Sequence, residues 1–353
     1  MNILHSISQY GHEQLVFCND KKNGLKAVIA IHDTTLGPSL GGCRFWDYKD
    51  ENEAILDVLR LSRGMTYKAA IAGLNLGGGK SVIIGQPEKL KSRKFFHSFG
   101  KYVDSLAGRY ITAEDVNIRV EDINMVAEKT SHVVGVTNSP NGSGDPSPFT
   151  ALGVFWGIKA AAKHKFGTES LENLKIAVQG CGAVGQNLIN LLHHEKAKVC
   201  VADLSEDTTR KMKDRYGVQV VSIDKIHATD CDIFAPCALG GILNSNTIPE
   251  IKAKIIAGGA NNQLLDEKLH AIALNKRNIL FAPDYVINAG GLINVANELG
   301  GYNKDKATKD TIKIYETLQS IFATAEKKSL LPFEASNLLA EKIITEKKKE
   351  KQN

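Results

Sequence analysis

The spacing of hydrophobic positions predicts strands and helices in the first part of the chain. Residues 25–34, "LKAVIAIHDT", form a short apolar run that predicts a strand. In "EAILDVLRLSRGMTYKAA" apolar side chains recur at helix spacing. One helix face would be formed by Ala54, Ile55, Val58, Leu59 and Ser62. "KSVIIG", which begins at Lys80, predicts another strand.

Beyond residue 148 the pattern alternates between strands and helices. "LKIAVQ", "AKVCVADLS", "CDIFAPCA" and "AKIIAGGA" predict strands, and "VGQNLINLLHHE" has the spacing of an amphipathic helix. Strands separated by helices imply a mostly parallel, doubly wound sheet, because parallel neighbours need a crossover connection. From about Asp310 the chain is predicted to be helical again, and a last helix follows "LLPF". The fold class predicted is α/β.

A stretch rich in Pro, Gly, Ser, Asn and Asp interrupts these patterns at "TNSPNGSGDPSP", residues 137–148. That composition is typical of a linker or an ordered turn. A chain of 353 residues is long enough for two domains, each with its own core. We therefore expect one domain over residues 1–136 and a second over 145–330, with a C-terminal helix of about residues 331–353 packing back on the first.

Composition and charge narrow the class of protein. Hydrophobic residues make up 43% and charged residues 24%, and the net charge is +5, which is the balance of an ordinary globular protein. No basic stripe with interleaved aromatics points to nucleic acid, and no apolar run is long enough to span a membrane. The first residues lack the pattern of a signal peptide, so a cytoplasmic protein is expected. The six cysteines and ten histidines have no zinc-type spacing, which predicts reduced thiols and no metal site.

The strongest local motif is "LKIAVQGCGAVGQNL". Gly180, Gly182 and Gly185 form GxGxxG directly after a predicted strand and before a predicted helix, where a dinucleotide pyrophosphate meets a helix N-terminus. Asp203 lies about twenty residues on, where its carboxylate would accept hydrogen bonds from the adenosine ribose hydroxyls. A carboxylate there would repel the 2′-phosphate of NADP, so NAD is the predicted cofactor. The alternative is a structural glycine turn with a solvated aspartate.

The stretch "GLNLGGGKS" resembles a phosphate-binding loop, but its spacing is wrong. The GxxxxGK[ST] pattern needs a glycine six residues before the lysine, and for Lys80 that position is Leu74. An amine-oxidising dehydrogenase offers a better fit: Lys68 would pair with a substrate carboxylate, and a buried Lys80 would act as a base. Asp115 in "ITAEDV" would exchange protons with that lysine. The alternatives are a helix N-cap role for Asp115 and a solvated surface position for Lys80.

With these residues in view, the chain closely resembles the amino-acid dehydrogenases specific for leucine, phenylalanine and valine, relatives of glutamate dehydrogenase. The resemblance extends over nearly the whole chain, through "HDTTLGPSLGGCR", "LRLSRGMTYKAA", "GLNLGGGKSVIIG", "RYITAEDV", "IAVQGCGAVG", "DIFAPCALGG", "GGANNQL" and "APDYVINAGGLINVANE". It implies reversible oxidative deamination, in which an L-amino acid, NAD and water give a 2-oxo acid, ammonia and NADH.

The resemblance also implies roles for individual residues. Lys80 and Asp115 match the catalytic lysine and the proton-handling acid, and Lys68 the lysine that holds the substrate carboxylate. The residues implied in substrate binding are Lys68, Leu40, Gly41, Met65, Ala113, Asn288, Leu292 and Val295. The residues implied in cofactor binding are Gly180, Cys181, Gly182, Ala183, Val184, Gly185, Gln186, Asp203, Cys237, Ala238 and Asn261, with "PCAL" (236–239) and Asn288 beside the nicotinamide.

The resemblance further implies a first domain for substrate binding and oligomerisation, a Rossmann-type second domain for NAD, and a homo-oligomer, commonly an octamer in the leucine-specific members. Family members close two domains over the reacting centre, with residues 137–148 and 288–291 as hinge candidates.

The implied side-chain pocket is apolar and uncharged, which excludes a glutamate side chain as the preferred substrate. "GLNLGGGK" and "LGPSLGGCR" resemble the leucine-specific members, so leucine is the expected substrate. Valine and isoleucine should also be accepted, because one methylene in an apolar pocket changes discrimination by only about 1–3 kcal/mol. "DVNIRVED" after Glu114 and a valine at 134 depart from the leucine-specific pattern, and "DVNI" and "ALGGILNS" resemble tryptophan-specific relatives. An aromatic substrate, phenylalanine or tryptophan, is thus the alternative. A catalytically silent NAD-binding regulatory protein is a more remote one.

Overall fold

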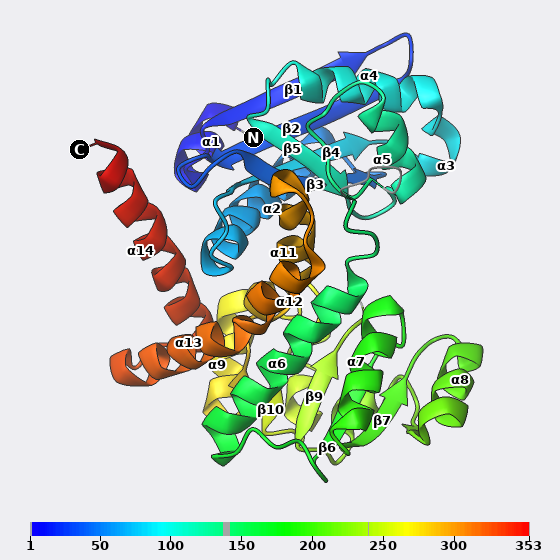
Figure 1. Cartoon of the computed structure of the whole chain (residues 1–353), viewed down its shortest axis with the longest axis vertical. Helices are drawn as coiled ribbons and strands as arrows, with labels where there is room; N and C mark the ends of the chain where they lie inside the picture. The colour runs from blue at the N-terminus through cyan, green and yellow to red at the C-terminus, as the bar shows by residue number, and fades with distance from the viewer. Residues whose placement is uncertain (1, 137–141, 239, 353) are drawn as a thin grey trace. The chain divides into compact units, whose positions relative to one another are not determined.

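The computed structural model describes residues 2–136, 142–238 and 240–352. Its backbone divides into two compact units, which are described here one after the other (Figure 1). The first comprises Met1–Asp145, Val295–Asn303 and Ala340–Asn353, and the second Pro146–Asn294 and Lys304–Leu339. The expected division places residues 295–303 in the second domain and residues 331–339 with the first. In the structure, residues 295–303 belong to the first unit and residues 331–339 to the second. Both of these boundaries lie inside helices, α11 (Gly290–Ala296) and α14 (Pro332–Gln352), where no loop composition marks them.

The first unit contains a mixed five-stranded sheet in the order β1-β2-β4-β3-β5. Its strands are β1 (Gln14–Asp20), β2 (Leu25–Asp33), β3 (Ser39–Trp46), β4 (Gly77–Ile84) and β5 (Tyr110–Glu114). β2 runs antiparallel to β1 and β4, whereas β3 is parallel to both β4 and β5. The ends of β4 and β5 therefore lie on either side of β3.

Helices cover both faces of this sheet, with α2 (Glu51–Ile71) on one and α4 (Arg93–Asp104) with α5 (Val120–Ala127) on the other (Figure 1). Alternation along β2 explains the two cores: Ile29 packs with the α4 and α5 side, and Val28 with the α2 side. Helix α2 begins after Asp50, whose side chain accepts a hydrogen bond from Glu53 N–H. The shorter helices of this unit are α1 (Ile3–Tyr10), α3 (Pro87–Leu90) and the 3₁₀ turn η3 (Asn297–Gly300).

The second unit contains a six-stranded, wholly parallel sheet in the order β11-β10-β9-β6-β7-β8. Its strands are β6 (Lys175–Gln179), β7 (Lys198–Ala202), β8 (Gln219–Val220), β9 (Ile233–Pro236), β10 (Ile255–Ile256) and β11 (Leu280–Phe281). The chain moves outward from β6 in one direction, then returns to β9 and moves outward in the other. This is the doubly wound Rossmann order, and its switch point lies between β6 and β9. The predicted α/β fold is confirmed.

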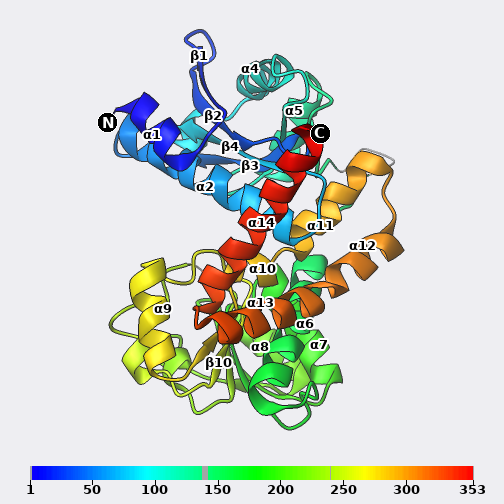
Figure 2. The same ribbon diagram turned by 90° about the vertical axis from the view of Figure 1, so that its left-hand side faces the viewer.

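Helices flank this sheet on both sides, with α9 (Glu267–Lys276) on one and α6 (Ser147–Phe166) on the other (Figure 2). The remaining helices of the second unit are α7 (Ala183–His194), α8 (Glu206–Tyr216), α10 (Asp284–Ile287), α12 (Lys304–Ile312), α13 (Ile314–Lys328), and the 3₁₀ turns η1 (Ile226–Ala228) and η2 (Ile248–Glu250). No helix in the described part of the chain combines the length and apolar composition that a membrane span needs.

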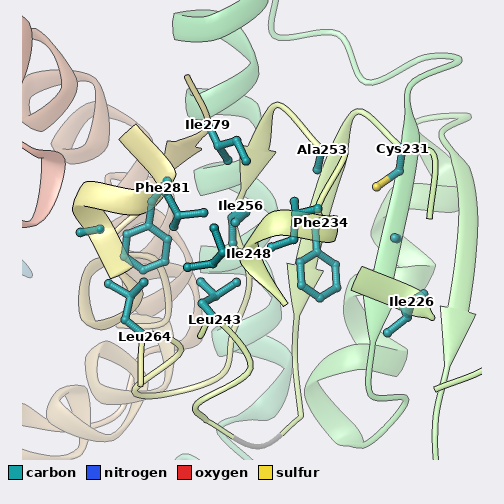
Figure 3. Packing of buried hydrophobic residues seen from close by; sticks show 14 of the residues in the cluster. Ile226, Cys231, Phe234, Leu243, Ile248, Ala253, Ile256, Leu264, Ile279 and Phe281 are labelled. Carbon is teal, nitrogen blue, oxygen red and sulfur yellow. The ribbon is translucent and has the colours of Figure 1, made fainter. Parts of the chain in front are cut away.

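A buried apolar cluster fixes the β9 side of this sheet (Figure 3). Phe234, Ile256 and Phe281 are paired across β9, β10 and β11, so their side chains form one row on the same face. Leu243 and Leu264 pack beneath the row from the connecting segments. The parallel pairing of Gln179 with Pro236 places the carboxyl end of β9 beside that of β6.

Candidate active site

Lys80 and Asp115 form an ion pair on the first unit's sheet. Lys80 lies within β4 and is only 5% exposed, and Asp115 follows the last residue of β5. The Nζ of Lys80 lies 3.0 Å from Oδ2 of Asp115. Helix α5 begins at Val120 after Arg119, so the alternative in which Asp115 caps that helix is wrong. The burial of Lys80 likewise rules out the solvated surface position.

A second cation, Arg44, contacts the same carboxylate oxygen. Arg44 lies on β3, where strand alternation directs Cys43 and Phe45 to the α4 side and Arg44 to the face that carries Lys80. Its Nε donates to Asp115 Oδ2 at 3.2 Å, and its Nη1 donates to Asp57 Oδ2 on α2 at 2.9 Å. We did not predict a role for Arg44 from the sequence, although the quoted motif "HDTTLGPSLGGCR" ends on it.

The electrostatics of the site keep Asp115 ionised and the nearby thiol protonated. Burial opposes the charge on Asp115, but the charges of Lys80 and Arg44 and the hydrogen bond from Lys80 outweigh it, so the pKa of the Asp115 carboxyl lies below its ordinary value. Burial raises the pKa of Cys43 to about 12. Cys43 therefore stays a thiol and is not a nucleophile at neutral pH.

The three glycines before Lys80 belong to β4, so the strand begins three residues earlier than predicted. A Cβ on Gly78 would lie 2.1 Å from the backbone nitrogen of Thr66 on α2, and one on Gly79 would lie 2.6 Å from the Tyr110 ring. The glycine strand therefore lets α2 pack directly on the backbone beside Lys80. Gly42 makes similar room, since a Cβ there would lie 2.9 Å from the Cβ of Asp115.

Helix α2 also carries two of the predicted substrate-binding residues. Lys68 lies in its last turn, and Met65 precedes it by three residues, which places both on adjoining parts of one helix face. Met65 is adjacent to Gly41 on β3, where a Cβ would lie 3.4 Å from the Met65 Cγ. Leu40 is buried on the same strand, and Ala113 is paired with Gly42 across β3 and β5. The structure thus brings these five residues to neighbouring elements of the first unit.

Two buried histidines attach α2 to the rest of the unit. His12 Nε2 lies 2.7 Å from Ser62 Oγ, and His32 Nδ1 lies 2.7 Å from Thr66 Oγ1, one helical turn further on. Because Ser62 donates its hydroxyl proton to the Val58 carbonyl, His12 Nε2 is the donor in its pair. His12 Nδ1 is buried and has no hydrogen-bond partner in the described structure, so Nδ1 carries no proton and the ring is neutral.

This arrangement predicts that the protein loses stability in mild acid. Burial, followed by the charge of His32, lowers the pKa of His12 from 6.5 to about 4. Between pH 6.5 and about 4 the unfolded chain binds a proton at His12 that the folded chain does not. The contribution of His12 to stability is therefore full above pH 6.5, falls progressively as the pH drops from 6.5, and is fully lost below about pH 4. The loss from His12 is expected to be about 3 kcal/mol. Urea unfolding across this range should give a shallower pH dependence for His12→Gln, whereas His5→Gln, an exposed position on α1, should keep the parental slope.

In the second unit, the GxGxxG segment forms the turn between β6 and α7. Gly180 has a φ of +94°, and its N–H donates to Ala202 O at 2.8 Å. A Cβ on Gly185 would lie 2.0 Å from Gly180 O, so this glycine permits the close contact of helix and turn, whereas the space around Gly182 is open. Glycine at 182 therefore leaves an uncovered helix N-terminus, which fits a pyrophosphate. The other predicted members of this segment are Cys181, Ala183, Val184 and Gln186, whose Nε2 donates to Cys181 O at 2.8 Å.

Asp203 lies beside this turn, directly after β7. Its Oδ2 accepts a hydrogen bond from Cys181 N–H at 2.6 Å and its Oδ1 from Ser205 N–H at 2.8 Å. The carboxylate is partly exposed and its orientation is fixed by these two backbone donors. It is thus placed to accept further hydrogen bonds from a ribose next to the glycine turn.

The segment after β9 meets the same turn at the switch point. Cys237 N–H donates to Gln179 O at 2.7 Å, and a Cβ on Gly180 would lie 2.9 Å from the Cβ of Ala238. Leu239, the last residue of "PCAL", and residues 137–141 of the predicted hinge lie outside the described residues. Nearby, Asn288 Nδ2 donates to Asn261 Oδ1 at 2.6 Å and to Gly259 O at 3.3 Å.

Leu292 and Val295 lie three residues apart on α11, with Leu292 in the second unit and Val295 in the first. Leu292 is buried and Val295 partly exposed. Among the described residues, no group of three or more histidine, cysteine or acidic side chains is arranged to hold a metal ion.

Comparison with known proteins gives matches over nearly the whole chain. The dimerisation-domain model of the Glu/Leu/Phe/Val dehydrogenases matches residues 12–132, and the Glutamate/Leucine/Phenylalanine/Valine dehydrogenase model matches 142–209 and 201–350. Leucine dehydrogenase of Geobacillus stearothermophilus is 50% identical over 98% of this chain and 94% of its own. L-tryptophan dehydrogenase of Nostoc punctiforme is 48% identical over 99% of this chain and 98% of its own.

A solved structure agrees with these sequence matches. The crystal structure of L-tryptophan dehydrogenase from Nostoc punctiforme covers 98% of this chain and 99% of its own, with a TM-score of 0.88 at 47% identity. The predicted relationship is confirmed, and the chain belongs to the Glu/Leu/Phe/Val dehydrogenase family.

Proposed function

We propose that this chain catalyses the reversible, NAD-dependent oxidative deamination of a branched-chain L-amino acid. The amino acid, NAD and water would give the 2-oxo acid, ammonia, NADH and a proton. The observation that carries the proposal is the buried Lys80 amine, 3.0 Å from the Asp115 carboxylate. The 50% identity to leucine dehydrogenases over almost the whole chain supports the same assignment.

In this proposal the residues of the first unit bind the substrate and move protons. The Lys68 ammonium would pair with the substrate carboxylate and so orient the α-carbon. Asp115, kept as a carboxylate by its two cationic neighbours, would accept a proton from the substrate ammonium. Lys80 would act in the hydration step as the neutral amine, after its own proton has left to solvent, and would take a proton from the water that attacks the substrate imine. That proton, passed on to the nitrogen, would release ammonia and leave Lys80 neutral again. Bound NAD would supply the hydride acceptor.

The substrate class follows from the proposed pocket. The residues proposed to line it are Leu40, Gly41, Met65, Ala113, Leu292 and Val295. None of them could pair with a second carboxylate, which disfavours glutamate, and their apolar surface suits leucine, valine and isoleucine. The 48% identity to L-tryptophan dehydrogenase favours a second candidate, the same reaction on an aromatic amino acid.

A substrate panel tests both candidates. The purified protein is supplied with NAD and with leucine, valine, isoleucine, phenylalanine, tryptophan or glutamate, and NADH formation is followed by absorbance. The highest kcat/KM is expected for leucine, with valine and isoleucine within about 10–200-fold. A maximum with phenylalanine or tryptophan would support the aromatic candidate. No NADH from any of the six would contradict the proposed reaction and favour a silent NAD-binding protein.

Asp203 is expected to determine the cofactor preference. The parental protein should use NAD much better than NADP, because the carboxylate accepts ribose hydrogen bonds and repels a 2′-phosphate. Asp203→Ala should raise the KM for NAD by about 10–100-fold, the value of one charged hydrogen bond, and reduce the preference. Asp207→Asn, at an exposed acid on α8, is the control. Equal use of both cofactors by the parental protein would contradict this role.

We further propose that the first unit binds the amino acid and forms the subunit contacts, and that the second binds NAD. The match of residues 12–132 to a dimerisation-domain model supports a homo-oligomer, and we expect an octamer. We also infer a cytoplasmic site of action, since all six cysteines are unpaired thiols. Light scattering of the protein as it elutes from a size-exclusion column measures the number of subunits in the oligomer.

A further inference from the structure

Arg44 lies between two carboxylates and contacts both through different nitrogens. Its Nε faces Asp115 at 3.2 Å, and its Nη1 faces Asp57 at 2.9 Å. Asp57 Oδ2 also accepts a hydrogen bond from Tyr48 OH at 2.6 Å. The guanidinium is planar, so contacts at two of its nitrogens fix both its position and its plane.

The contact with Asp115 uses the oxygen that also faces Lys80. Lys80 Nζ and Arg44 Nε both lie within 3.2 Å of Asp115 Oδ2. Without Arg44, the Asp115 carboxylate would keep its contacts with Lys80 and with the backbone N–H of Val116, but it could still turn its other oxygen toward the amine. The contact with Arg44, from a neighbouring strand, restricts that rotation.

The charges along this network alternate. Lys80 and Arg44 carry two positive charges, and Asp115 and Asp57 two negative ones, in the order Lys80, Asp115, Arg44, Asp57. The side chains of Arg44, Asp57 and Asp115 are 22–26% exposed, so the pairs are only partly screened by water. Removal of one member leaves its neighbour partly buried without its counter-ion, which is costly. Neutralising Asp57 should therefore shift Arg44 and, through Arg44, the position of the Asp115 carboxylate.

We propose that Arg44 is a positioning residue of the active site, which holds the Asp115 carboxylate against the Lys80 amine. Asp57, which accepts a hydrogen bond from Tyr48, does not contact Asp115 itself but orients Arg44. The inference rests on the proposed function, since it gives Lys80 and Asp115 the proton transfers. It assigns no contact with substrate to Arg44 or Asp57.

The first test is the variant Arg44→Met, in which an unbranched side chain replaces the aliphatic part of arginine and carries no charge. We expect kcat to fall by about 100-fold, the cost of misplacing a catalytic group by about 1 Å, while the KM for NAD stays within a few-fold. The acid limb of the kcat profile should move to higher pH, because the Asp115 carboxylate loses a cation. The titratable or charged groups that interact electrostatically with Asp115 are Lys80 on β4, Arg44 and Cys43 on β3, Tyr110 and Glu114 on β5, and Tyr48.

Rescue and a double-mutant cycle separate positioning from a merely structural role. Guanidinium ion at millimolar concentration should restore part of the rate of Arg44→Ala. Asp57→Asn should lower kcat by about 3–10-fold, and its effect should vanish in the Arg44→Met background, because Asp57 acts only through Arg44. The matched control is Lys91→Met, which breaks another partly buried ion pair of this unit, with Asp122, away from Lys80. Lys91→Met should lower the melting temperature but keep the parental kcat and pH profile.

Two readouts keep this inference separate from the proposed reaction. If the parental protein oxidises amino acids and Arg44→Met keeps kcat within about 3-fold of Lys91→Met, the inference is wrong. If the parental protein oxidises none of the panel, the proposed function fails, and crystal structures still test the positioning. Those of Arg44→Met and Asp57→Asn should show the Asp115 carboxylate rotated and its distance to Lys80 Nζ lengthened. An unchanged pair in both variants would overturn the inference.

Discussion

Replacing Lys80 with alanine is expected to lower kcat for amino-acid oxidation by about 10³-fold, within the range of a lost general acid–base group. The variant loses the only amine that the described structure places on the Asp115 carboxylate. Folding should survive, since Asp115 keeps its contact with Arg44 and alanine fits a strand whose neighbours at 77–79 are glycines. The measurement is the initial rate of NADH formation, with NAD binding determined separately by calorimetry.

NAD affinity should stay within about 3-fold of the parental value, because the proposed dinucleotide residues belong to the second unit. Lys26→Ala is the matched control: it removes an exposed lysine from β2 of the same sheet and should keep the parental rate. A near-parental rate in Lys80→Ala would contradict the assignment of Lys80 as the proton-transfer amine. Lost NAD binding would instead indicate that the substitution damages the whole fold.

The parts of the molecule that the sequence predicted well are those specified by local patterns. The strand, turn and helix around Gly180 need only a buried apolar run, glycines at fixed spacing and helix periodicity, all within residues 175–194. Asp203 follows the next strand of the same repeat, and parallel neighbours end at the same edge of a sheet, so its contact with Cys181 could be anticipated. The parallel direction of the strands follows from the regular alternation of strands and helices, but the strand order does not.

The Arg44 network could not be predicted in the same way. Arg44, Asp57 and Asp115 meet because β3 lies between β4 and β5, and because α2 crosses the face to which Arg44 points. No local periodicity specifies that strand order in a mixed sheet. The start of β4 was also missed, since glycine has a low strand propensity and the three glycines resemble a loop. Their place in the strand is explained only by the helix that packs on them.

That packing predicts the second large effect, at Gly78. A Cβ there would lie 2.1 Å from Thr66 N and 2.5 Å from Ser62 O, which are backbone atoms of α2 and cannot be moved by a side-chain rotation. Gly78→Ala must therefore displace α2 or distort β4. We expect a loss of about 3 kcal/mol in the free energy of unfolding. We also expect kcat/KM for the amino acid to fall by about 100-fold, because Lys68 follows Thr66 by two residues and would move with the helix.

Gly64→Ala on the same helix is the matched control, because no atom other than those of the adjoining helix backbone lies within 4 Å of the Cβ it would add. Alanine is favoured over glycine inside a helix, so this variant should be more stable by up to about 1 kcal/mol and keep the parental rate. The free energy of unfolding in urea and the rate of NADH formation with leucine are measured for both variants. If Gly78→Ala matched Gly64→Ala in stability and rate, the glycines would not be needed for the contact between helix and strand. Their presence beside Lys80 would then call for a reason other than packing, such as direct approach of the substrate to the backbone.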